Sequence, residues 1–202
     1  MSDETISCFL VDRDEKGEVH TRIDSLPPAS FPDGPVEIAV EFSSLNYKDT
    51  LAVAGHRGIV REFPHVPGID AAGRLLSDDH PVWPEGMEVL VTGFDLGASR
   101  WGGWAERVCV PVEWVIPLPE GLSLHRSMQL GTAGLTAALA IDAIAAAGLT
   151  PSSGPVLVTG ATGGVGLLSV AILDRLGFEV VASTGKADRH DLLRQHGADT
   201  VI

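Results

Sequence analysis

The sequence predicts an α/β protein in which an all-β N-terminal part, a partly open β-barrel, precedes the first half of a doubly wound parallel sheet. Three observations support this fold class. Short segments of alternating apolar and polar residues, separated by turns rich in Gly, Pro and Asp, fill residues 1–121. Strand, helix, strand, helix, strand patterns follow in residues 122–202. A glycine-rich turn at residues 160–166 joins the first of these later strands to its helix.

In the N-terminal part, alternation predicts strands at residues 7–12, 19–23, 36–42, 69–76, 87–92 and 105–110. The turn at residues 14–17 makes a hairpin of the first two strands. Residues 43–46 end the third strand, a short helix follows at 47–54, and a loop covers 55–67. We expect the four tryptophans to lie around the edges of this barrel: Trp83, Trp101, Trp104 and Trp114.

In the C-terminal part, residues 127–147 are predicted to form one long helix of small residues. A short buried strand at 156–159, a helix at 165–176 ended by Gly177, a strand at 178–183, a helix at 187–196 and entry into a third strand at 197–202 follow. We therefore expect domains at 1–121 and 122–202. A complete dinucleotide fold has two such halves, in strand order 3-2-1-4-5-6. With only the first half present, the strand at 156–159 would lose one neighbour and show an apolar edge, so a fragment of a longer enzyme is expected.

The composition excludes several classes of protein. With 45% hydrophobic and 20% charged residues, the 202-residue chain is typical of a soluble globular protein. Its net charge of −13 argues against nonspecific nucleic-acid binding. The acidic N-terminus is unlike a signal peptide, and the apolar run at 133–149 is short for a membrane span and contains Asp142. Cys8 and Cys109 lie far apart, which favours reduced core thiols in a cytoplasmic protein.

The glycine turn has the chemistry of a phosphate cradle. Aligned to G-x-G-x-x-G it has Ala161 in place of the first glycine, followed by Gly163 and Gly166, while Gly160 supplies local freedom. Gly163 and Gly166 stand where close pyrophosphate approach and tight helix–strand packing require them. The N–H groups and positive dipole end of the next helix would face the phosphates. Glycine-rich turns also occur without a ligand, and that alternative stays open.

The end of the second strand indicates which cofactor the cradle takes. An enzyme for NAD normally has an acid there, about 20 residues after the glycines, to bind the ribose hydroxyl. This chain has Ser183, Thr184, Gly185 and Lys186, with Arg189 close by. Hydroxyls and a cation suit the 2′-phosphate of NADPH. The alternative is that Lys186 and Arg189 are only the solvated start of a helix.

Other chemistries have little support in the sequence. We expect no metal site, because there is no Cys-x-x-Cys and the histidines are scattered. The glycine turn carries Thr162 and has no serine in G-x-S-x-G order, so it is no nucleophile elbow.

Five motifs, in order, resemble the medium-chain dehydrogenase/reductase superfamily, and most of all its zinc-independent quinone oxidoreductase branch, which includes acryloyl-CoA reductases. They are Ser-Ser-Leu-Asn-Tyr-Lys-Asp at 43–49, Val-Pro-Gly-Ile-Asp at 66–70, Trp-Gly-Gly-Trp-Ala-Glu at 101–106, Gly-Thr-Ala-Gly-Leu-Thr-Ala at 131–137 and Thr-Gly-Ala-Thr-Gly-Gly-Val-Gly at 159–166. The resemblance implies a GroES-like β domain followed by a Rossmann domain, with the active site in the cleft between them. It also implies that about another third of the family's sequence is missing.

The resemblance carries over site residues one by one. It places Tyr47 and Thr50 near the nicotinamide and the stretch with Thr132 beneath the cofactor. It assigns the pyrophosphate to Thr162, Gly163, Gly164 and Val165, and the 2′-phosphate to Thr184, Gly185 and Lys186. Zinc-containing relatives have Gly-His-Glu where this chain has Gly-Ile-Asp at 68–70, so zinc catalysis is not expected.

The leading hypothesis is hydride transfer from NADPH to the β-carbon of an activated alkene such as an enoyl-CoA, in an enzyme that is a homodimer at full length. Tyr47 is the candidate for placing a proton or hydrogen bond, supported by Asn46 and Asp49. The alternative for Tyr47 is a core aromatic. Arg57 and Arg61 could bind the phosphates of a CoA thioester or belong to a solvated loop. Quinone reduction and non-catalytic NADPH binding stay open as alternative functions.

Overall fold

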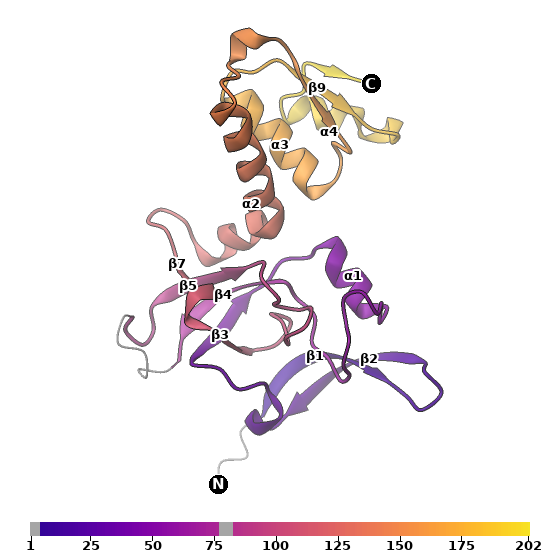
Figure 1. Cartoon of the computed structure of the whole chain (residues 1–202), viewed down its shortest axis with the longest axis vertical. Helices are drawn as coiled ribbons and strands as arrows, with labels where there is room; N and C mark the ends of the chain where they lie inside the picture. Colours follow the sequence, from indigo (N-terminus) through magenta and orange to yellow (C-terminus); the bar gives the residue numbers. More distant parts are fainter. Residues whose placement is uncertain (1–4, 77–82) are drawn as a thin grey trace. The chain divides into compact units, whose positions relative to one another are not determined.

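The computed structural model describes residues 5–76 and 83–202. Backbone contacts divide the chain into two compact units, Met1–Gly131 and Thr132–Ile202, drawn in indigo to pink and in brown to yellow in Figure 1. The first unit contains two sheets and the second unit one, and each unit has its own hydrophobic core. The division agrees with the predicted succession of a β-rich part and a doubly wound part.

The main sheet of the first unit has the strand order β6-β3-β4-β5-β7, and its paired strands are antiparallel. Its strands are β3 (Val36–Phe42), β4 (Asp70–Leu75), β5 (Glu88–Thr92), β6 (Arg107–Val110) and β7 (Ile116–Pro117). Alternation places Ile38, Val89 and Val110 on the face that points into the core. The sequence predicted these strands except β7, which is too short to show a period.

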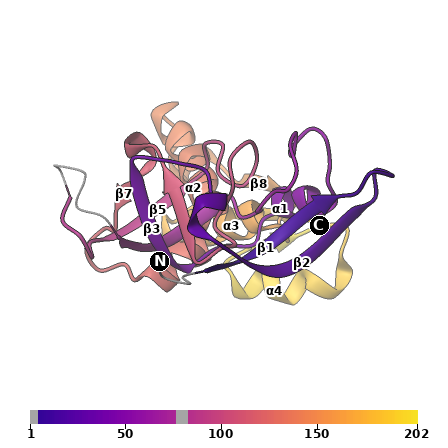
Figure 2. The ribbon, with the colours of Figure 1, turned by 90° about the horizontal axis from the view of Figure 1, so that it is seen from below.

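A hairpin completes the β-rich part of this unit. Strands β1 (Ile6–Arg13) and β2 (Val19–Leu26) pair antiparallel along their whole length, as both views show (Figures 1 and 2). Single bridges join β1 to the rest of the unit, from Cys8 to Ala105 and from Val11 to His65. The β-rich part is therefore open between its two sheets, as the sequence predicted. The four tryptophans are all half-buried.

The helix predicted at residues 127–147 is observed as α2 (Leu124–Ala146), but it is not one uninterrupted helix. Gly131 has φ 51° and ψ −154°, far from helical values. A β-carbon at Gly131 would lie 2.5 Å from Ser44 Oγ and 2.6 Å from Asp70 Oδ2. Ser44 Oγ also donates a hydrogen bond to the carbonyl of Met128, at 2.7 Å. The break therefore depends on contacts from distant parts of the sequence, which a local pattern does not contain.

The second unit has a parallel sheet in the order β10-β9-β8, which confirms the predicted 3-2-1 arrangement. Its elements are β8 (Val156–Thr159), α3 (Gly164–Arg175), β9 (Val180–Ser183), α4 (His190–Gln195) and β10 (Thr200–Val201). Ile141 of α2 packs with Val170 and Leu173 of α3 in the core of this unit, and the two helices lie side by side in Figure 1.

Two details of the second unit concern its last helix and its first strand. Residues 187–196 form a short 3-10 helix (Ala187–Arg189) followed by α4 rather than one helix. Strand β8 has the expected apolar edge, since Leu157 is 56% exposed, so it is not the buried strand that its composition alone predicts. Within the described residues β8 pairs only with β9, so its other edge and the adjacent side chains lack the cover that a complete sheet would supply. Three further 3-10 helices are Pro28–Ser30, Val112–Trp114 and Pro151–Ser153.

Helix α2 is the one helix among the described residues that is long and apolar enough to cross a membrane by length and composition. Such a helix alone is weak evidence, because core helices of soluble proteins pass the same test. The break at Gly131 and the packing of Ile141 into the second core agree with a helix that belongs to the folded units.

We predict that Gly131→Ala lowers the free energy of unfolding by about 3 kcal/mol, because the new methyl group combines a backbone conformation reserved for glycine with two close contacts. Urea unfolding of the full-length protein measures the change. The matched control is Gly121→Ala, where φ is 81° but no atom lies within 4 Å of the added carbon. Equal losses in both variants would show that the contacts with Ser44 and Asp70 contribute nothing.

Candidate functional site

In the first unit, the candidate catalytic residues stand at the start of α1 (Tyr47–Val53). Asn46 is the N-cap of this helix and has extended backbone angles. Its backbone N–H donates to Asp49 Oδ2 at 2.8 Å. A carboxylate in the first turn also suits the positive end of the helix dipole. The contact between Asn46 and Asp49 therefore fixes the point at which α1 begins.

Asp49 is fully buried and holds α1 against the segment that leads into β4. Its Oδ1 accepts hydrogen bonds from the backbone N–H groups of Gly68, at 3.1 Å, and Ile69, at 3.0 Å. Burial raises the pKa of the Asp49 carboxyl, and the backbone N–H donors offset part of the rise. Because both oxygens bind backbone groups, Asp49 supports the site by fixing its geometry.

Asp70, at the start of β4, is a second fully buried acid, and it fixes the amide of Asn46. Asn46 Nδ2 donates to Asp70 Oδ2 at 2.8 Å, and Thr92 Oγ1 donates to Asp70 Oδ1 at 2.5 Å. Ser43 Oγ donates to the backbone carbonyl of Asp70 at 2.7 Å. Neither Asp70 nor Thr92 is among the site residues that the sequence predicts. The available signal was an acid at the start of a largely apolar strand, which must find polar partners when it is buried.

Tyr47 and Thr50 lie on the outer side of α1. Tyr47 is 79% exposed, so the alternative that it is a core aromatic is wrong. Thr50 is also exposed, and its Oγ1 donates to the carbonyl of Tyr47 at 2.7 Å. The phenol of Tyr47 is therefore accessible to a ligand, with its backbone held by the first turn of the helix.

In the second unit, the glycine turn has the geometry that the sequence predicted. Gly160 has φ 59°, and a β-carbon on Gly166 would lie 2.5 Å from the carbonyl oxygen of Gly160. Gly163 is the N-cap of α3, and Gly164 and Val165 are its first two residues. These three residues are exposed, so the N-terminal N–H groups of the helix are accessible to an anion.

The end of β9 lies directly beside this turn. Thr162 Oγ1 is 3.3 Å from Thr184 Oγ1, which joins the predicted pyrophosphate turn to the predicted 2′-phosphate loop. The backbone N–H of Lys186 donates to Thr184 Oγ1 at 3.2 Å. Lys186 and Gly185 are exposed, whereas the side chain of Arg189 pairs with Asp188 at 3.2 Å. Lys186 is therefore better placed than Arg189 to bind a phosphate.

The remaining predicted residues divide between the two units. Thr132 is half-buried, and its neighbour Ala133 would lie 3.3 Å from a β-carbon on Gly164, so this stretch runs beside the glycine turn. Arg57 and Arg61 are both exposed on the loop after α1. Arg61 lines a cavity of about 640 Å³, and Arg57 is not among the residues that line it.

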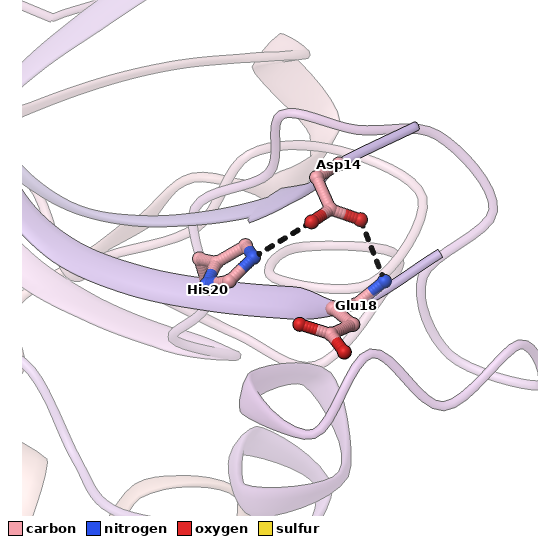
Figure 3. A group of neighbouring side chains, drawn as sticks. All are labelled: Asp14, Glu18 and His20. Atoms are coloured by element: carbon pink, nitrogen blue, oxygen red, sulfur yellow. Dashed lines mark hydrogen bonds and ion pairs between the residues drawn. The ribbon is translucent and has the colours of Figure 1, made fainter. Parts of the chain in front are cut away.

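One group of described residues has the spacing of metal ligands, and it lies away from these residues. The ligand atoms of Asp14, Glu18 and His20, at the turn of the β1–β2 hairpin, lie within 4.8 Å of one another (Figure 3). All three residues are exposed. Asp14 Oδ1 accepts the backbone N–H groups of Lys16 and Glu18, both at 2.9 Å. These hydrogen bonds stabilise the turn and explain why the three side chains lie close together.

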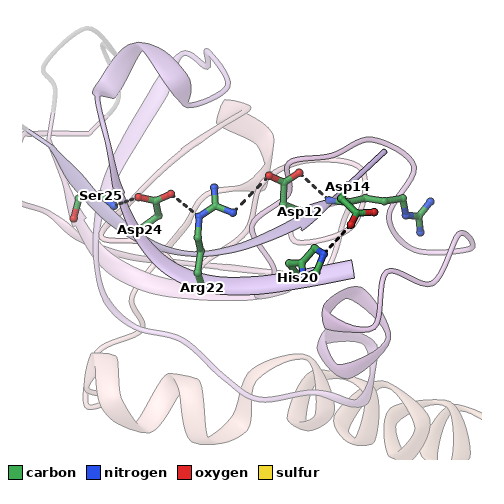
Figure 4. A network of polar contacts seen from close by, with 7 residues as sticks. Asp12, Asp14, His20, Arg22, Asp24 and Ser25 are labelled. Carbon is green, nitrogen blue, oxygen red and sulfur yellow. Dashed lines mark hydrogen bonds and ion pairs between the residues drawn. The ribbon is translucent and has the colours of Figure 1, made fainter. Parts of the chain in front are cut away.

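The neighbouring charges on the hairpin form a surface network. Arg22 contacts Asp24 at 2.8 Å and Asp12 at 3.5 Å, in a row along the strands (Figure 4). Exposed pairs of this kind contribute little to stability. Ile69, in the Gly-Ile-Asp motif at 68–70, is apolar and buried, and the neighbouring Asp70 accepts a hydrogen bond from Asn46.

Comparisons with known proteins find sequences similar to most of this chain. Residues 32–120 match the alcohol dehydrogenase GroES-like domain family. Acrylyl-CoA reductase AcuI of Ruegeria pomeroyi is 44% identical over 197 residues, which cover 97% of this chain and 60% of that protein. Putative quinone oxidoreductase YhfP of Bacillus subtilis is 46% identical over 185 residues, which cover 92% of this chain and 56% of that protein.

Solved structures show the same similarity. The yhdH oxidoreductase of Salmonella enterica, in complex with NADP, has a TM-score of 0.94 and 41% identity, with 97% of this chain and 60% of that chain covered. B. subtilis yhfP, with NAD bound, has a TM-score of 0.93 and 44% identity, with 99% and 60% covered. This chain thus spans about 60% of the length of these relatives.

We predict that Asp49→Asn lowers the free energy of unfolding by about 1–3 kcal/mol. An asparagine oxygen can still accept from Gly68 and Ile69, but its NH₂ group would then face the N–H of Asn46. Urea unfolding of the full-length protein measures the loss. The control is Asp142→Asn, at an exposed position whose side chain has no hydrogen bond among the described residues, where a change within about 0.5 kcal/mol is expected. A neutral Asp49→Asn would contradict the support role.

Proposed function

Because the chain belongs to the medium-chain dehydrogenase/reductase superfamily, we propose that the full-length protein is an NADPH-dependent, zinc-independent oxidoreductase. Its proposed reaction is reduction of the activated C=C bond of a 2-enoyl thioester such as acryloyl-CoA. The observation that carries this proposal is the 44% identity, over 97% of the chain, to a protein named acrylyl-CoA reductase. We also propose a cytoplasmic homodimer with domains at 1–121 and 122–202; the unpaired Cys8 and Cys109 suit a reducing compartment.

The proposed cofactor residues fit NADPH. Thr162, Gly163, Gly164 and Val165 would hold the pyrophosphate at the exposed N-terminus of α3. Thr184, Gly185 and Lys186 would hold the 2′-phosphate, and the 3.3 Å contact between Thr162 and Thr184 makes one continuous polar surface of the two loops. A relative has been solved with NAD bound, so the choice between the two cofactors rests on Lys186. When bound, the nicotinamide supplies the hydride.

The residues of the first unit would orient the substrate and a proton. Tyr47 is exposed and would donate a hydrogen bond or proton to the reacting enoyl group. Asn46, held by Asp70, would present its amide in one orientation, while Asp49 keeps the helix start in place. Thr50 and Thr132 are proposed to contact the cofactor. The protein's contribution is then orientation and polarisation.

Quinone reduction with the same cofactor is the second candidate. The specific observation in its favour is the 46% identity to putative quinone oxidoreductase YhfP. Quinone reduction needs no protonation at an α-carbon, so it depends less on a positioned proton donor. Turnover of acryloyl-CoA and of a quinone by the full-length protein, each with NADPH, therefore separates the two functions. Absence of acryloyl-CoA turnover would rule out the first.

We predict that Lys186→Ala raises the KM for NADPH by about tenfold or more and leaves the KM for NADH nearly unchanged. The lysine would lose a charge-assisted contact to the 2′-phosphate, which NADH does not have. Steady-state kinetics of the full-length protein with both cofactors measures the difference. Arg189→Ala is the matched control, because Arg189 already pairs with Asp188. An equal effect of Lys186→Ala on both cofactors would contradict the 2′-phosphate assignment.

We predict that Tyr47→Phe lowers kcat/KM for acryloyl-CoA by about 100-fold and that for a quinone by much less. The variant keeps the ring and removes the hydroxyl, so the helix start should be unchanged. Lys48→Ala, at the next exposed position, controls for a general effect on α1. Equal losses with both substrates would exclude a specific role for the Tyr47 hydroxyl in the enoyl reaction.

A further inference from the structure

The cavity that Arg61 lines is a concave surface of the first unit. It measures about 640 Å³ and lies between the loop at 61–65 and the segment at 95–101, with Pro32 and Trp114 completing its wall. Ligand pockets commonly measure about 300–1,000 Å³. None of the proposed catalytic or cofactor residues lines it.

Two indole rings of this cavity are fixed in place. Trp101 Nε1 donates to the carbonyl of Pro64 at 3.0 Å, and its ring meets Phe31 edge to face at 5.2 Å. Trp114 stacks on Phe94, with the ring centroids 5.1 Å apart and the planes 4° from parallel. Phe94 has φ 52°, a conformation that costs a bulky residue free energy. The strained turn thus supports a preorganised aromatic wall.

The charged groups of the cavity differ in their availability. The guanidinium of Arg100 donates to the carbonyls of Cys109, at 2.7 Å, and of Asp33. Within the described part of the chain, the guanidinium of Arg61 and the carboxylates of Glu62 and Asp95 have no side-chain hydrogen bond or ion pair. The cavity therefore offers one available cation and two available carboxylates beside its indole rings.

We propose that this cavity binds the 3′-phosphoadenosine end of a coenzyme A thioester. The assignment rests on the proposed function and specifies how that substrate is held. An adenine ring can stack on an indole face, and its amino group can donate to a carboxylate. Arg61 can bind a phosphate, to which an arginine can donate two parallel hydrogen bonds. Arg57 lies outside the cavity, so of the two arginines in the loop only Arg61 is proposed to bind this phosphate.

The position of the cavity suits a ligand that continues into the candidate site. His65 lines the cavity, and the chain reaches Gly68 three residues later, where the backbone N–H binds Asp49. His65 itself is buried, its Nε2 is 3.0 Å from the carbonyl of Gly97, and burial lowers the pKa of its imidazole. It therefore adds no charge at neutral pH. The flexible pantetheine arm would connect the adenosine end to an enoyl group near Asn46.

Calorimetric titration of the full-length protein with adenosine 3′,5′-bisphosphate tests the proposal. NADP⁺ is present at saturation, so that the probe does not enter the cofactor site. We expect the probe to bind the wild type, Arg61→Ala to weaken binding by about tenfold or more, and Arg57→Ala to change it less than about twofold. No binding, or equal effects of the two variants, would overturn the proposal. Equal affinity for 5′-AMP would assign the cavity to a free adenine nucleotide and overturn it as well.

Kinetics separates this proposal from the proposed function. With NADPH as reductant, Arg61→Ala should raise the KM for acryloyl-CoA and leave kcat and the KM for acryloyl-pantetheine unchanged. Reduction of both thioesters with the same KM by the wild type would overturn the cavity assignment and keep the proposed function. Binding of the bisphosphate that depends on Arg61, without reduction of either thioester, would keep the cavity assignment and overturn the proposed function.

Discussion

The buried carboxylate of Asp70 accepts the hydrogen bonds that hold the candidate site in the first unit together. An acid inside a sheet is tolerated only when its oxygens have partners, and here Asn46 and Thr92 supply them. The first partner belongs to the start of α1 and the second to the end of β5. One carboxylate therefore fixes the orientation of a candidate site residue and ties it to two strands of the sheet.

The same group explains why Gly131 interrupts α2. A side chain at this position would enter the space of Asp70 Oδ2 and Ser44 Oγ, at 2.6 and 2.5 Å. Ser44 in turn donates to the Met128 carbonyl in the last turn before the break. The helical backbone is therefore interrupted next to the polar cluster, and the second compact unit begins at the next residue, Thr132.

The sequence predicted the elements whose causes are local. The alternation of apolar and polar residues predicted the bounds of β3, and the glycines at 160–166 predicted β8, the turn and α3. These features are local, because a strand, a positive φ and a helix N-cap are each set by a few adjacent residues. The break in α2 and the Asn46–Asp70–Thr92 cluster depend on residues far apart in the chain. The composition of β8 predicts a buried strand, and only the strand order of the fold predicts its exposed apolar edge.

The net charge of the chain does not predict whether it binds anionic ligands. The net charge of the chain is −13, yet the proposed 2′-phosphate site and the proposed coenzyme A phosphate site depend on one exposed cation each, Lys186 and Arg61. Screening limits the reach of surface charge to about 10 Å, so a phosphate responds to the groups beside it and hardly to the sum. At the glycine turn those groups are the N–H groups of α3 and the hydroxyls of Thr162 and Thr184, all neutral donors. An acidic protein can therefore bind a polyanionic cofactor, provided that the donors are held in place before the cofactor arrives.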